Sequence, residues 1–380
     1  MGATGSIGTQ TLDVLRRERE RFDLVAISAA RNVDALAAIA EEFSVTAVGV
    51  ATDSDAVALG RRVGADVRVV VGEAGLSELA GDADVVVNAV TGFAGLPVTL
   101  AALGAGARLA LANKESLVAA APLVDRVRTA AAEIVPIDSE HCAIHQCLAG
   151  SSSRPGHPDV RRLILTASGG PFRTKTRDEL ADVTKVDALK HPTWSMGPKI
   201  TIDSSTLMNK GLEVLEASAL FGVDVDRIDV VVHPQSIVHS MVEYVDGATI
   251  AQLSRPDMRL PIAYALGLPE RLPHAFGRLG FDEPVTLTFE APDFKAFPAL
   301  GLAYEAGRRG GAAPAWLSAA NEVAVEAFLN DEIRWIDIVS VVADVLDDYL
   351  DDPLTSVEAL REVDSAARAR ARERISRFTR

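Results

Sequence analysis

Short apolar runs alternate with stretches of helical periodicity over residues 1–138. Runs rich in Val, Ile, Leu and Ala predict strands that are buried on both faces of a parallel sheet. These runs are residues 24–28, 45–50, 67–71, 84–89, 108–112 and 134–137. Between the first two, apolar residues recur at helical spacing from Val33 to Phe43, with Asn32 as the predicted N-cap. We therefore expect a Rossmann-like, doubly wound α/β domain over residues 1–138.

The pattern changes after residue 138, where loops rich in Gly, Ser and Pro interrupt the alternation. Apolar runs here predict strands at residues 163–167, 228–233, 240–244 and 249–253. A turn at Asp246-Gly247 joins the last two as a hairpin. We interpret residues 139–267 as an α+β substrate domain.

The remainder of the chain divides into a linker and a helical domain. Residues 268–295 contain several prolines and little periodicity, which predicts a linker that crosses the surface. Helical periodicity then predicts a C-terminal helical domain over residues 296–380, with helices at 316–329 and 333–350.

Composition and charge limit the partners of this protein. Apolar residues make up 48% and charged residues 24% of the 380 residues, and the formal net charge is −15. A surface this negative repels phosphate backbones and anionic lipid headgroups, so we expect neither nucleic acid nor a membrane as partner. Only two cysteines are present, which indicates a reducing compartment, and we expect no secretory signal, since the first residues show no basic segment followed by an apolar one. We expect a cytoplasmic location.

A glycine-rich loop, residues 2–8, runs from Met1 into the first helical pattern. Glycines let main-chain amides approach a pyrophosphate at a helix N-terminus. After the first predicted strand, Arg31 stands where NAD-dependent enzymes carry an acidic residue, which favours NADP over NAD. Such a loop normally follows a central strand. That strand is absent here, so we expect the functional protein to begin about 6–10 residues upstream, and this form to fold poorly or bind NADPH weakly.

Carboxylates and a lysine follow the predicted strands at the edge where ligands bind in this fold. Asp138 and Glu140 are two residues apart, and in extended backbone both would face one point, where a cation must separate their charges. Oxygen ligands without a thiolate indicate Mg²⁺ or Mn²⁺. Glu213 offers a third carboxylate, on one helix face with Asn209 and Lys210 if Ser204 or Ser205 caps that helix. Lys114, after another strand, is a candidate substrate-facing cation.

Two loops suit a phosphorylated substrate. Ser168-Gly169-Gly170 follows a predicted strand and offers main-chain amides to a phosphate. Residues 191–197, bounded by Pro and Gly, contain Trp194 and Met196 and read as a flap, for which we expect the range 187–199. His141, Cys142, His145 and Cys147 match no structural zinc pattern. The C-terminal arginines are interpreted as a solvated helix end.

These motifs together resemble the 1-deoxy-D-xylulose 5-phosphate reductoisomerase family of the non-mevalonate isoprenoid pathway. The resemblance rests on Gly-Ala-Thr-Gly-Ser-Ile-Gly, Ala-Asn-Lys-Glu-Ser, Asp-Ser-Glu-His, Ser-Gly-Gly-Pro-Phe, His-Pro-Thr-Trp-Ser-Met-Gly, Asn-Lys-Gly-Leu-Glu, His-Pro-Gln-Ser and Arg-Pro-Asp-Met, in family order along nearly the whole chain. It implies an NADPH domain, a catalytic domain with a mobile flap, a helical domain and a homodimer.

The resemblance also implies roles for individual residues. The metal ligands would be Asp138, Glu140 and Glu213. Substrate and phosphate would contact Lys114, Ser139, Glu140, Ser168, His191, Trp194, Met196, Ser204, Asn209, Lys210 and Glu213, with Ser236, His239 and Met258 lining the pocket. NADPH would contact Thr4, Gly5, Ser6, Ile7, Ala30, Arg31, Asn32, Asn113, Glu115 and Gly197. Ala30 stands where many family members have Gly, a mild departure.

The implied reaction is a metal-assisted rearrangement of the carbon skeleton, followed by hydride transfer from NADPH to give 2-C-methyl-D-erythritol 4-phosphate. The sequence does not distinguish a retro-aldol/aldol route from a 1,2-shift. Two other functions remain open. A semialdehyde dehydrogenase would need an activated cysteine, whereas Cys142 and Cys147 follow acidic Asp138 and Glu140. A non-enzymatic NADPH-binding regulator would not need convergent carboxylates.

Overall fold

The computed structural model describes residues 1–151, 156–194, 196–350 and 354–377, and it divides into two compact units. Unit 1 comprises Met1–Ser116, Val124–Cys142 and Asp257–Arg278. Unit 2 comprises Leu117–Leu123, Ala143–Pro256 and Leu279–Arg380. Each unit is described by itself below. The predicted domain boundaries stay predictions.

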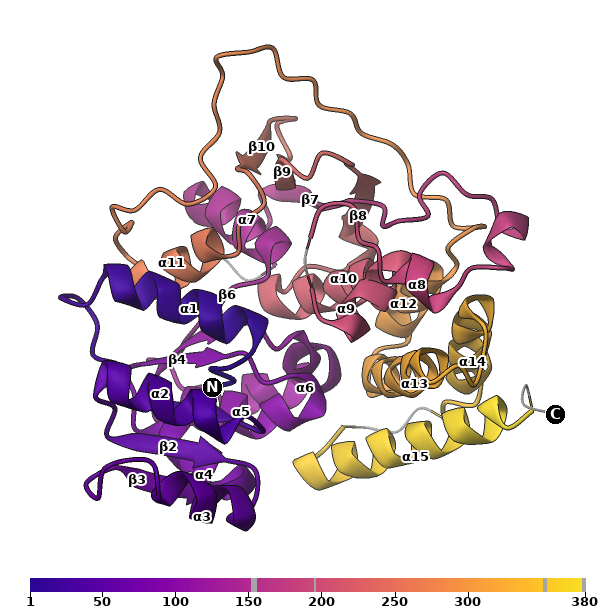
Figure 1. Cartoon of the computed structure of the whole chain (residues 1–380). Coiled ribbons are helices and arrows are strands. Elements are labelled where there is room, and N and C mark those ends of the chain that lie inside the picture. Colours follow the sequence, from indigo (N-terminus) through magenta and orange to yellow (C-terminus); the bar gives the residue numbers. More distant parts are fainter. Residues whose placement is uncertain (152–155, 195, 351–353, 378–380) are drawn as a thin grey trace. The chain divides into compact units, whose positions relative to one another are not determined.

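Two three-stranded parallel sheets form the centre of unit 1 (Figure 1). The first has the order β1-β2-β3, with β1 at Ala26–Ala29, β2 at Ala47–Val50 and β3 at Arg68–Val71. The second has the order β4-β5-β6, with β4 at Val85–Asn88, β5 at Arg108–Leu111 and β6 at Glu133–Pro136. All pairings are parallel, and every residue of β2 is buried, as expected for a sheet covered on both faces. The predicted parallel α/β fold is confirmed.

Helices follow the strands of unit 1 in the predicted alternation. They are α1 Ser6–Arg17, α2 Val33–Phe43, α3 Asp53–Gly60, α4 Gly72–Gly81, α5 Leu96–Ala105, α6 Lys114–Val127, α7 Ser139–Cys147 and α11 Arg259–Gly267, with a 3₁₀ turn at Gly92–Gly95. The predicted N-cap of α2 is confirmed, because Asn32 Oδ1 accepts a 3.1 Å hydrogen bond from the Ala35 amide. α6 and α7 each contribute residues to both units.

The first three residues join the two sheets of unit 1. The Met1 amine donates to Val87 O at 2.6 Å, and the Ala3 amide donates to Ser28 O at 2.8 Å. A cavity of about 450 Å³ lies beside them, and Leu12, Ile27 and Val87 are among its lining residues. In the usual strand order of this fold, 3-2-1-4-5-6, β1 corresponds to strand 2 and β4 to strand 4. The strand expected upstream would therefore lie between β1 and β4. The expected upstream strand stays a prediction.

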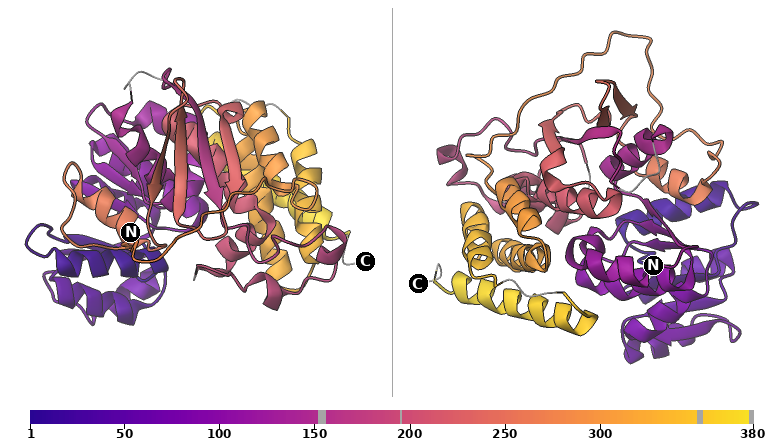
Figure 2. Two further views of the ribbon diagram at one scale, coloured as in Figure 1. Left: turned by 90° about the horizontal axis from the view of Figure 1, so that it is seen from above. Right: turned by 180° about the vertical axis from the view of Figure 1, so that it is seen from behind.

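Unit 2 is built on a four-stranded mixed sheet of order β10-β9-β7-β8 (Figure 2). The strands are β7 Val160–Ala167, β8 Ile228–Val232, β9 Val238–Tyr244 and β10 Thr249–Leu253. β7 pairs in parallel with β8, whereas its pairing with β9 and the β9–β10 hairpin are antiparallel. The predicted turn is confirmed, since Gly247 has φ +88° and Asp246 accepts from the Ala248 amide. The predicted linker, all of whose residues are described, forms one antiparallel β-bridge, in which Glu290 pairs with Val232 at the end of β8.

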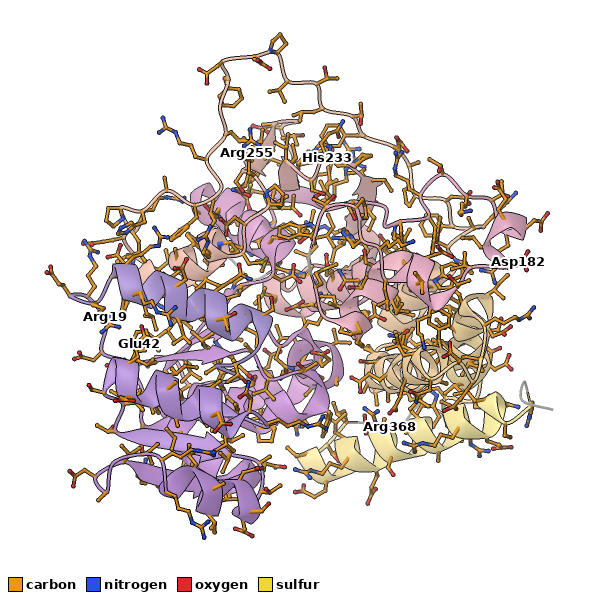
Figure 3. The ribbon with its side chains drawn as sticks, viewed as in Figure 1. Arg19, Glu42, Asp182, His233, Arg255 and Arg368 are labelled. Atoms are coloured by element: carbon orange, nitrogen blue, oxygen red, sulfur yellow. The ribbon has the colours of Figure 1, made fainter. Side chains whose placement is uncertain are left out.

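Helices complete unit 2. They are α8 Lys185–Ala188, α9 Pro198–Thr206, α10 Met208–Phe221, α12 Ala299–Arg309, α13 Ala313–Leu329, α14 Trp335–Asp347 and α15 Val357–Ile375, with 3₁₀ turns at Leu148–Gly150, Asp178–Leu180 and Val225–Arg227. Arg368, labelled in Figure 3, belongs to α15 and forms ion pairs with Glu322 of α13 and with Asp364. Within the described ranges, the structure contains no helix that is both long and apolar enough to cross a membrane.

Candidate active site

The glycine loop opens the first helix of unit 1 with its main chain close-packed. A Cβ added at Gly8 would lie 2.2 Å from Gly2 O, so only glycine allows this approach. Among the described residues, α1 has no side-chain N-cap and no acidic residue in its first turn. Thr4 to Ile7 therefore present the amide end of a helix, a site that favours an anion such as a pyrophosphate.

The segment after β1 lies at the same edge of the sheet as the glycine loop. The hydrogen bond from Ala3 to Ser28 ties the loop to the end of β1, and Ala30, Arg31 and Asn32 follow it, all exposed. Arg31 is thus an exposed residue that follows closely after the strand end bonded to the glycine loop. An exposed arginine at this place suits the 2′-phosphate of NADP.

Asn113 and Glu115 begin α6 and are buried within the protein. Asn113 Nδ2 donates to Val90 O at 2.7 Å, Gly92 O at 2.8 Å and Glu115 Oε2 at 3.0 Å, and its Oδ1 caps α6. The Asn113 amide therefore fixes the loop after β4 against the start of α6. Gly197, also predicted to contact NADPH, belongs to unit 2.

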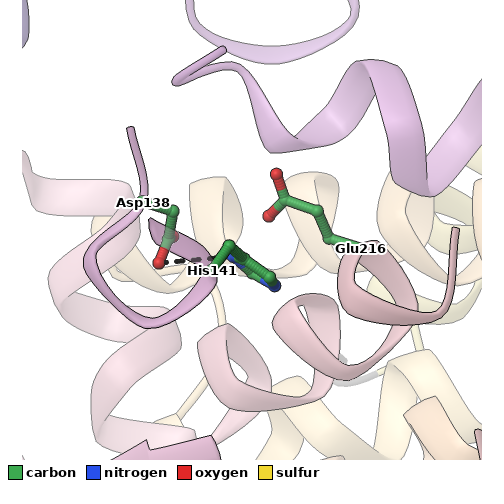
Figure 4. A group of neighbouring side chains, drawn as sticks. All are labelled: Asp138, His141 and Glu216. Carbon is green, nitrogen blue, oxygen red and sulfur yellow. Dashed lines mark ion pairs between the residues drawn. The ribbon is translucent and has the colours of Figure 1, made fainter. Parts of the chain in front are cut away.

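Asp138 follows β6 and is held by a lysine and a histidine. Lys114 Nζ lies 2.9 Å from Asp138 Oδ2, and His141 Nδ1 lies 3.5 Å from Asp138 Oδ1 (Figure 4). Glu216, also drawn there, lies on α10 in unit 2 and is fully buried. The expectation of extended backbone at Asp138–Glu140 was wrong, because α7 begins at Ser139 and places Glu140 in its first turn. There the Glu140 amide donates to Asp138 Oδ1 at 3.3 Å, and Ser139 Oγ donates to Glu140 at 2.5 Å.

Glu213 lies on α10 with the two residues predicted to accompany it. Asn209 Nδ2 and Lys210 Nζ both donate to the Glu213 carboxylate, and Lys210 and Glu213 are 4% and 1% exposed. The predicted capping of this helix by Ser204 or Ser205 was wrong. Both serines lie inside α9, and Leu207, with φ +61°, separates α9 from α10. The proline at the start of α9 allows that helix to begin earlier than the pattern suggested.

His191 brings two serines together in unit 2. Its Nε2 lies 3.2 Å from Ser168 Oγ and 3.1 Å from Ser204 Oγ. Its Nδ1 accepts from the Thr193 and Trp194 amides at 3.1 and 2.9 Å. Because Nδ1 is an acceptor, the ring is neutral with its proton on Nε2, and burial lowers the pKa of His191. Serine hydroxyls around an imidazole N–H form a polar cluster suited to phosphate oxygens.

The predicted flap begins at this cluster. The Trp194 ring lies 6.3 Å from the ring of His239, and both residues belong to unit 2, as does buried Ser236. Met196 is half-buried, and Ser195 lies outside the described residues. Met258, predicted to line the same pocket, belongs to unit 1.

The cysteines fit neither zinc binding nor nucleophilic catalysis. Across the described part of the chain, the residue groups able to hold one ion do not include Cys142, Cys147 or His145. Both cysteines are buried, and burial raises the pKa of the Cys147 thiol to about 11. A thiol with that pKa stays protonated at neutral pH, which argues against the semialdehyde dehydrogenase alternative.

Ser168, His191 and Ser204 are called the phosphate cluster below. Sequence reasoning missed two residues that hydrogen-bond to the neighbours of Ser204 in this cluster. Trp335 Nε1 donates to Ser205 Oγ, and Asn321 Nδ2 donates to Asp203 Oδ1, each at 2.8 Å. Both donors come from C-terminal helices more than 100 positions away in sequence. Neither stands in a motif, so only the tertiary structure reveals them.

Comparison with known protein families gives a consistent result along the chain. The family model described as 1-deoxy-D-xylulose 5-phosphate reductoisomerase matches residues 1–121. The C-terminal domain of that reductoisomerase matches residues 134–221, and the DXP reductoisomerase C-terminal domain matches residues 253–370. A reductoisomerase of this name from Cupriavidus metallidurans is 50% identical, over 99% of this chain and 97% of its own length.

Solved structures agree with these matches. The 1-deoxy-D-xylulose 5-phosphate reductoisomerase from Zymomonas mobilis in complex with NADPH is 44% identical, with a TM-score of 0.91, over 98% of this chain and 97% of that chain. A DOX-P reductoisomerase in complex with NADPH, fosmidomycin and magnesium is 42% identical, with a TM-score of 0.92, over 99% of this chain and 97% of that chain.

Proposed function

The chain belongs to the 1-deoxy-D-xylulose 5-phosphate reductoisomerase family, and we propose that the residues described above carry out that family's reaction. The enzyme converts 1-deoxy-D-xylulose 5-phosphate, NADPH and a proton into 2-C-methyl-D-erythritol 4-phosphate and NADP⁺, with a divalent metal ion. When bound, the metal supplies a Lewis acid for the rearrangement, and NADPH supplies the hydride for the reduction.

The edge of the unit 1 sheet fits NADPH. The uncapped N-terminus of α1 offers amides for the pyrophosphate, and the close approach at Gly8 keeps that end of the helix against the main chain. Exposed Arg31 would pair with the 2′-phosphate. Thr4, Gly5, Ser6 and Ile7 would line the pyrophosphate, with Ala30 and Asn32 beside the ribose.

Three carboxylates fit a divalent cation. Asp138 and Glu140 of unit 1 and Glu213 of unit 2 would supply oxygen ligands, and oxygen donors without a thiolate suit Mg²⁺ or Mn²⁺. Lys114 balances Asp138 within unit 1, and Lys210 balances Glu213 within unit 2. These lysines reduce the cost of holding buried carboxylates before the cation arrives. This all-oxygen carboxylate set is the observation that carries the proposal.

The serine and histidine cluster would hold the substrate's phosphate. The Ser168 and Ser204 hydroxyls and the His191 Nε2–H are donors grouped at one imidazole, and they can turn to phosphate oxygens. Asn209 and Lys210, at the start of α10, would add an amide and an ammonium. Lys114 and Ser139 would orient the reacting carbons, and Trp194 and Met196 of the flap would exclude water.

The homodimer and the cytoplasmic location stay predictions. Analytical ultracentrifugation of the purified chain would test the first. Exposed apolar side chains along residues 281–294, among them Phe281 and Phe289, support an interface with a second copy of the chain.

Removing a metal ligand tests the proposed site. Glu213→Gln and Asp138→Asn should each lower kcat roughly 100-fold or more, because the cation loses a charged ligand. The dissociation constant of NADPH should change by less than about twofold, since neither residue is among those proposed to bind NADPH. The matched control is Glu243→Gln on β9, which removes a carboxylate paired with Arg162 of β7 and should keep kcat. Wild-type turnover by either ligand variant at limiting metal would refute the assignment.

A further inference from the structure

Helix α9 carries Ser204 between two residues that are anchored to other helices. Asp203, before Ser204, accepts from Asn321 Nδ2 of α13 at 2.8 Å. Ser205, after Ser204, accepts from Trp335 Nε1 of α14 at 2.8 Å. Ser204 itself is half-buried, whereas both of its neighbours are buried. The anchored residues therefore fix the turn of helix that presents the Ser204 hydroxyl.

Both anchors are made in the protein interior. Asp203 and Ser205 are 1% and 0% exposed, and Asn321 and Trp335 are 0% and 1% exposed. A buried polar group that loses its partner is costly, because no water replaces the partner, so these hydrogen bonds favour one position of α9. Lys199 Nζ lies 2.7 Å from the Asp203 carboxylate and balances its charge.

Trp335 also packs against the other loop of the phosphate cluster. Its ring meets the ring of Phe172 edge to face, with centroids 5.6 Å apart and planes at 87°. Phe172 follows the loop that begins at Ser168. That loop approaches α9 closely, because a Cβ added at Gly170 would lie 2.8 Å from Ser204 O. One indole therefore contacts both elements from which the serines of the cluster come.

We propose that Trp335 and Asn321 are positioning residues for the substrate's phosphate. They act through Ser205, Asp203 and Phe172 to set the separation of the Ser204 and Ser168 hydroxyls around His191. This inference rests on the proposed function, which assigns that cluster to the phosphate. It gives the C-terminal helices of unit 2 a part in substrate affinity, although they bring no residue to the cluster itself.

A pair of matched tryptophan variants tests the proposal. Trp335→Phe keeps an aromatic ring but removes the N–H donor, so Ser204 should be held less firmly. We expect KM for 1-deoxy-D-xylulose 5-phosphate to rise roughly 3- to 10-fold, with kcat within about twofold. The inhibition constant of inorganic phosphate should rise by the same factor. Trp316→Phe is the control. It removes another buried indole donor, which bonds from α13 to Val345 O of α14, and it should leave KM and the inhibition constant of phosphate unchanged.

Further variants separate the possible outcomes. Ser205→Ala removes the acceptor and leaves the rings packed, so it should raise KM as Trp335→Phe does, and the double variant should be no worse than either. Ser205→Ala also tests the same hydrogen bond if Trp335→Phe does not fold. Asn321→Leu should raise KM in the same direction. Equal effects of Trp335→Phe and Trp316→Phe on the phosphate constants would overturn the positioning role. Ser204→Ala is the reference, because unchanged phosphate inhibition there would overturn the phosphate assignment itself.

Discussion

At the residue scale, His191 is the side chain whose protonation state its surroundings define most clearly. Two main-chain amides donate to Nδ1, so a proton there would face two other donors. Nε2 therefore carries the proton, within reach of Ser168 and Ser204. The same two amides belong to the start of the flap, so one imidazole links the flap to the phosphate cluster. The neutral state of His191 therefore allows both the bonds to the flap amides and the bonds to the two serines.

The lowered pKa of His191 predicts a dependence of stability on pH. Burial lowers the pKa of His191 in the folded chain below the ordinary value of 6.5, so as the pH falls the unfolded chain takes up a proton first. The stability from neutral His191 is therefore present above 6.5 and is lost as the pH falls through the folded pKa. Urea unfolding at about pH 7 and pH 5.5 should show a smaller loss for His191→Asn than for the wild type. Equal losses would contradict this.

Arg31 predicts the choice of nicotinamide cofactor. A charge-assisted hydrogen bond to a 2′-phosphate is worth about 1.5–3 kcal/mol, so Arg31→Ala should reduce the preference for NADPH over NADH roughly 10- to 150-fold. The ratio of the two kcat/KM values measures it. Arg61→Ala, an exposed arginine at the end of α3, is the control and should keep the wild-type ratio. An unchanged ratio in Arg31→Ala would remove Arg31 from the cofactor site.

Sequence pattern suggested the residues of the candidate site, but it did not indicate the distant residues that hydrogen-bond beside them. Asp138, Lys114 and His191 stand in motifs next to strands or Pro/Gly boundaries, where local pattern is informative. Trp335 and Asn321 contact α9 across 130 and 118 positions, and nothing near them in sequence marks that contact. Such long-range hydrogen bonds depend on how helices pack, which periodicity does not determine.

At the element scale, the break between α9 and α10 places the polar residues of both helices. Leu207 adopts φ +61°, a left-handed conformation that costs a non-glycine residue about 1–2 kcal/mol. Its side chain is 4% exposed, so burial offsets part of that cost. The break ends α9 just after Ser204 and starts α10 just before Asn209. A helix capped by Ser204 or Ser205, as expected from the sequence, would instead place both serines at the start of the helix that carries Asn209.

Gly170 predicts how closely the serine loop must approach α9. Gly170→Ala adds a Cβ at φ +66° and 2.8 Å from Ser204 O, so it should destabilise the fold and raise KM for the substrate. Gly247→Ala is the matched control, because φ is +88° there and a Cβ would meet nothing within 4 Å. We expect about 1–2 kcal/mol for Gly247→Ala from backbone strain alone, and a larger loss for Gly170→Ala. Chemical denaturation of both variants gives the comparison, and equal losses would contradict the clash.

The strands of unit 1 were predictable to within two residues at either end, since runs of Val, Ile and Leu with no polar alternation mark its parallel strands. The ends of the helices were less predictable than the ends of the strands. Glu140 was placed on extended backbone, although α7 already begins at Ser139. A Ser following an Asp satisfies the start of a helix as well as it satisfies a loop, so local pattern alone did not decide between them.

At the scale of the whole molecule, the proposed chemistry is divided between the two units. Unit 1 supplies the glycine loop, Arg31, Lys114 and Asp138, whereas unit 2 supplies the phosphate cluster, the flap and Glu213. Each unit pairs one of the proposed metal ligands with a lysine, Asp138 with Lys114 in unit 1 and Glu213 with Lys210 in unit 2. The proposed reaction therefore draws on residues of both units.

The most direct test of the account is turnover by the purified chain. The assay follows NADPH oxidation with 1-deoxy-D-xylulose 5-phosphate, with Mg²⁺ or Mn²⁺ and after removal of metal by a chelator, and identifies the product. We predict metal-dependent formation of one 2-C-methyl-D-erythritol 4-phosphate per NADPH oxidised, with kcat at saturating NADPH in the ordinary range of roughly 1–10³ s⁻¹. NADPH binding without turnover would favour the regulator alternative. That result, or oxidation that persists without metal, would contradict the account.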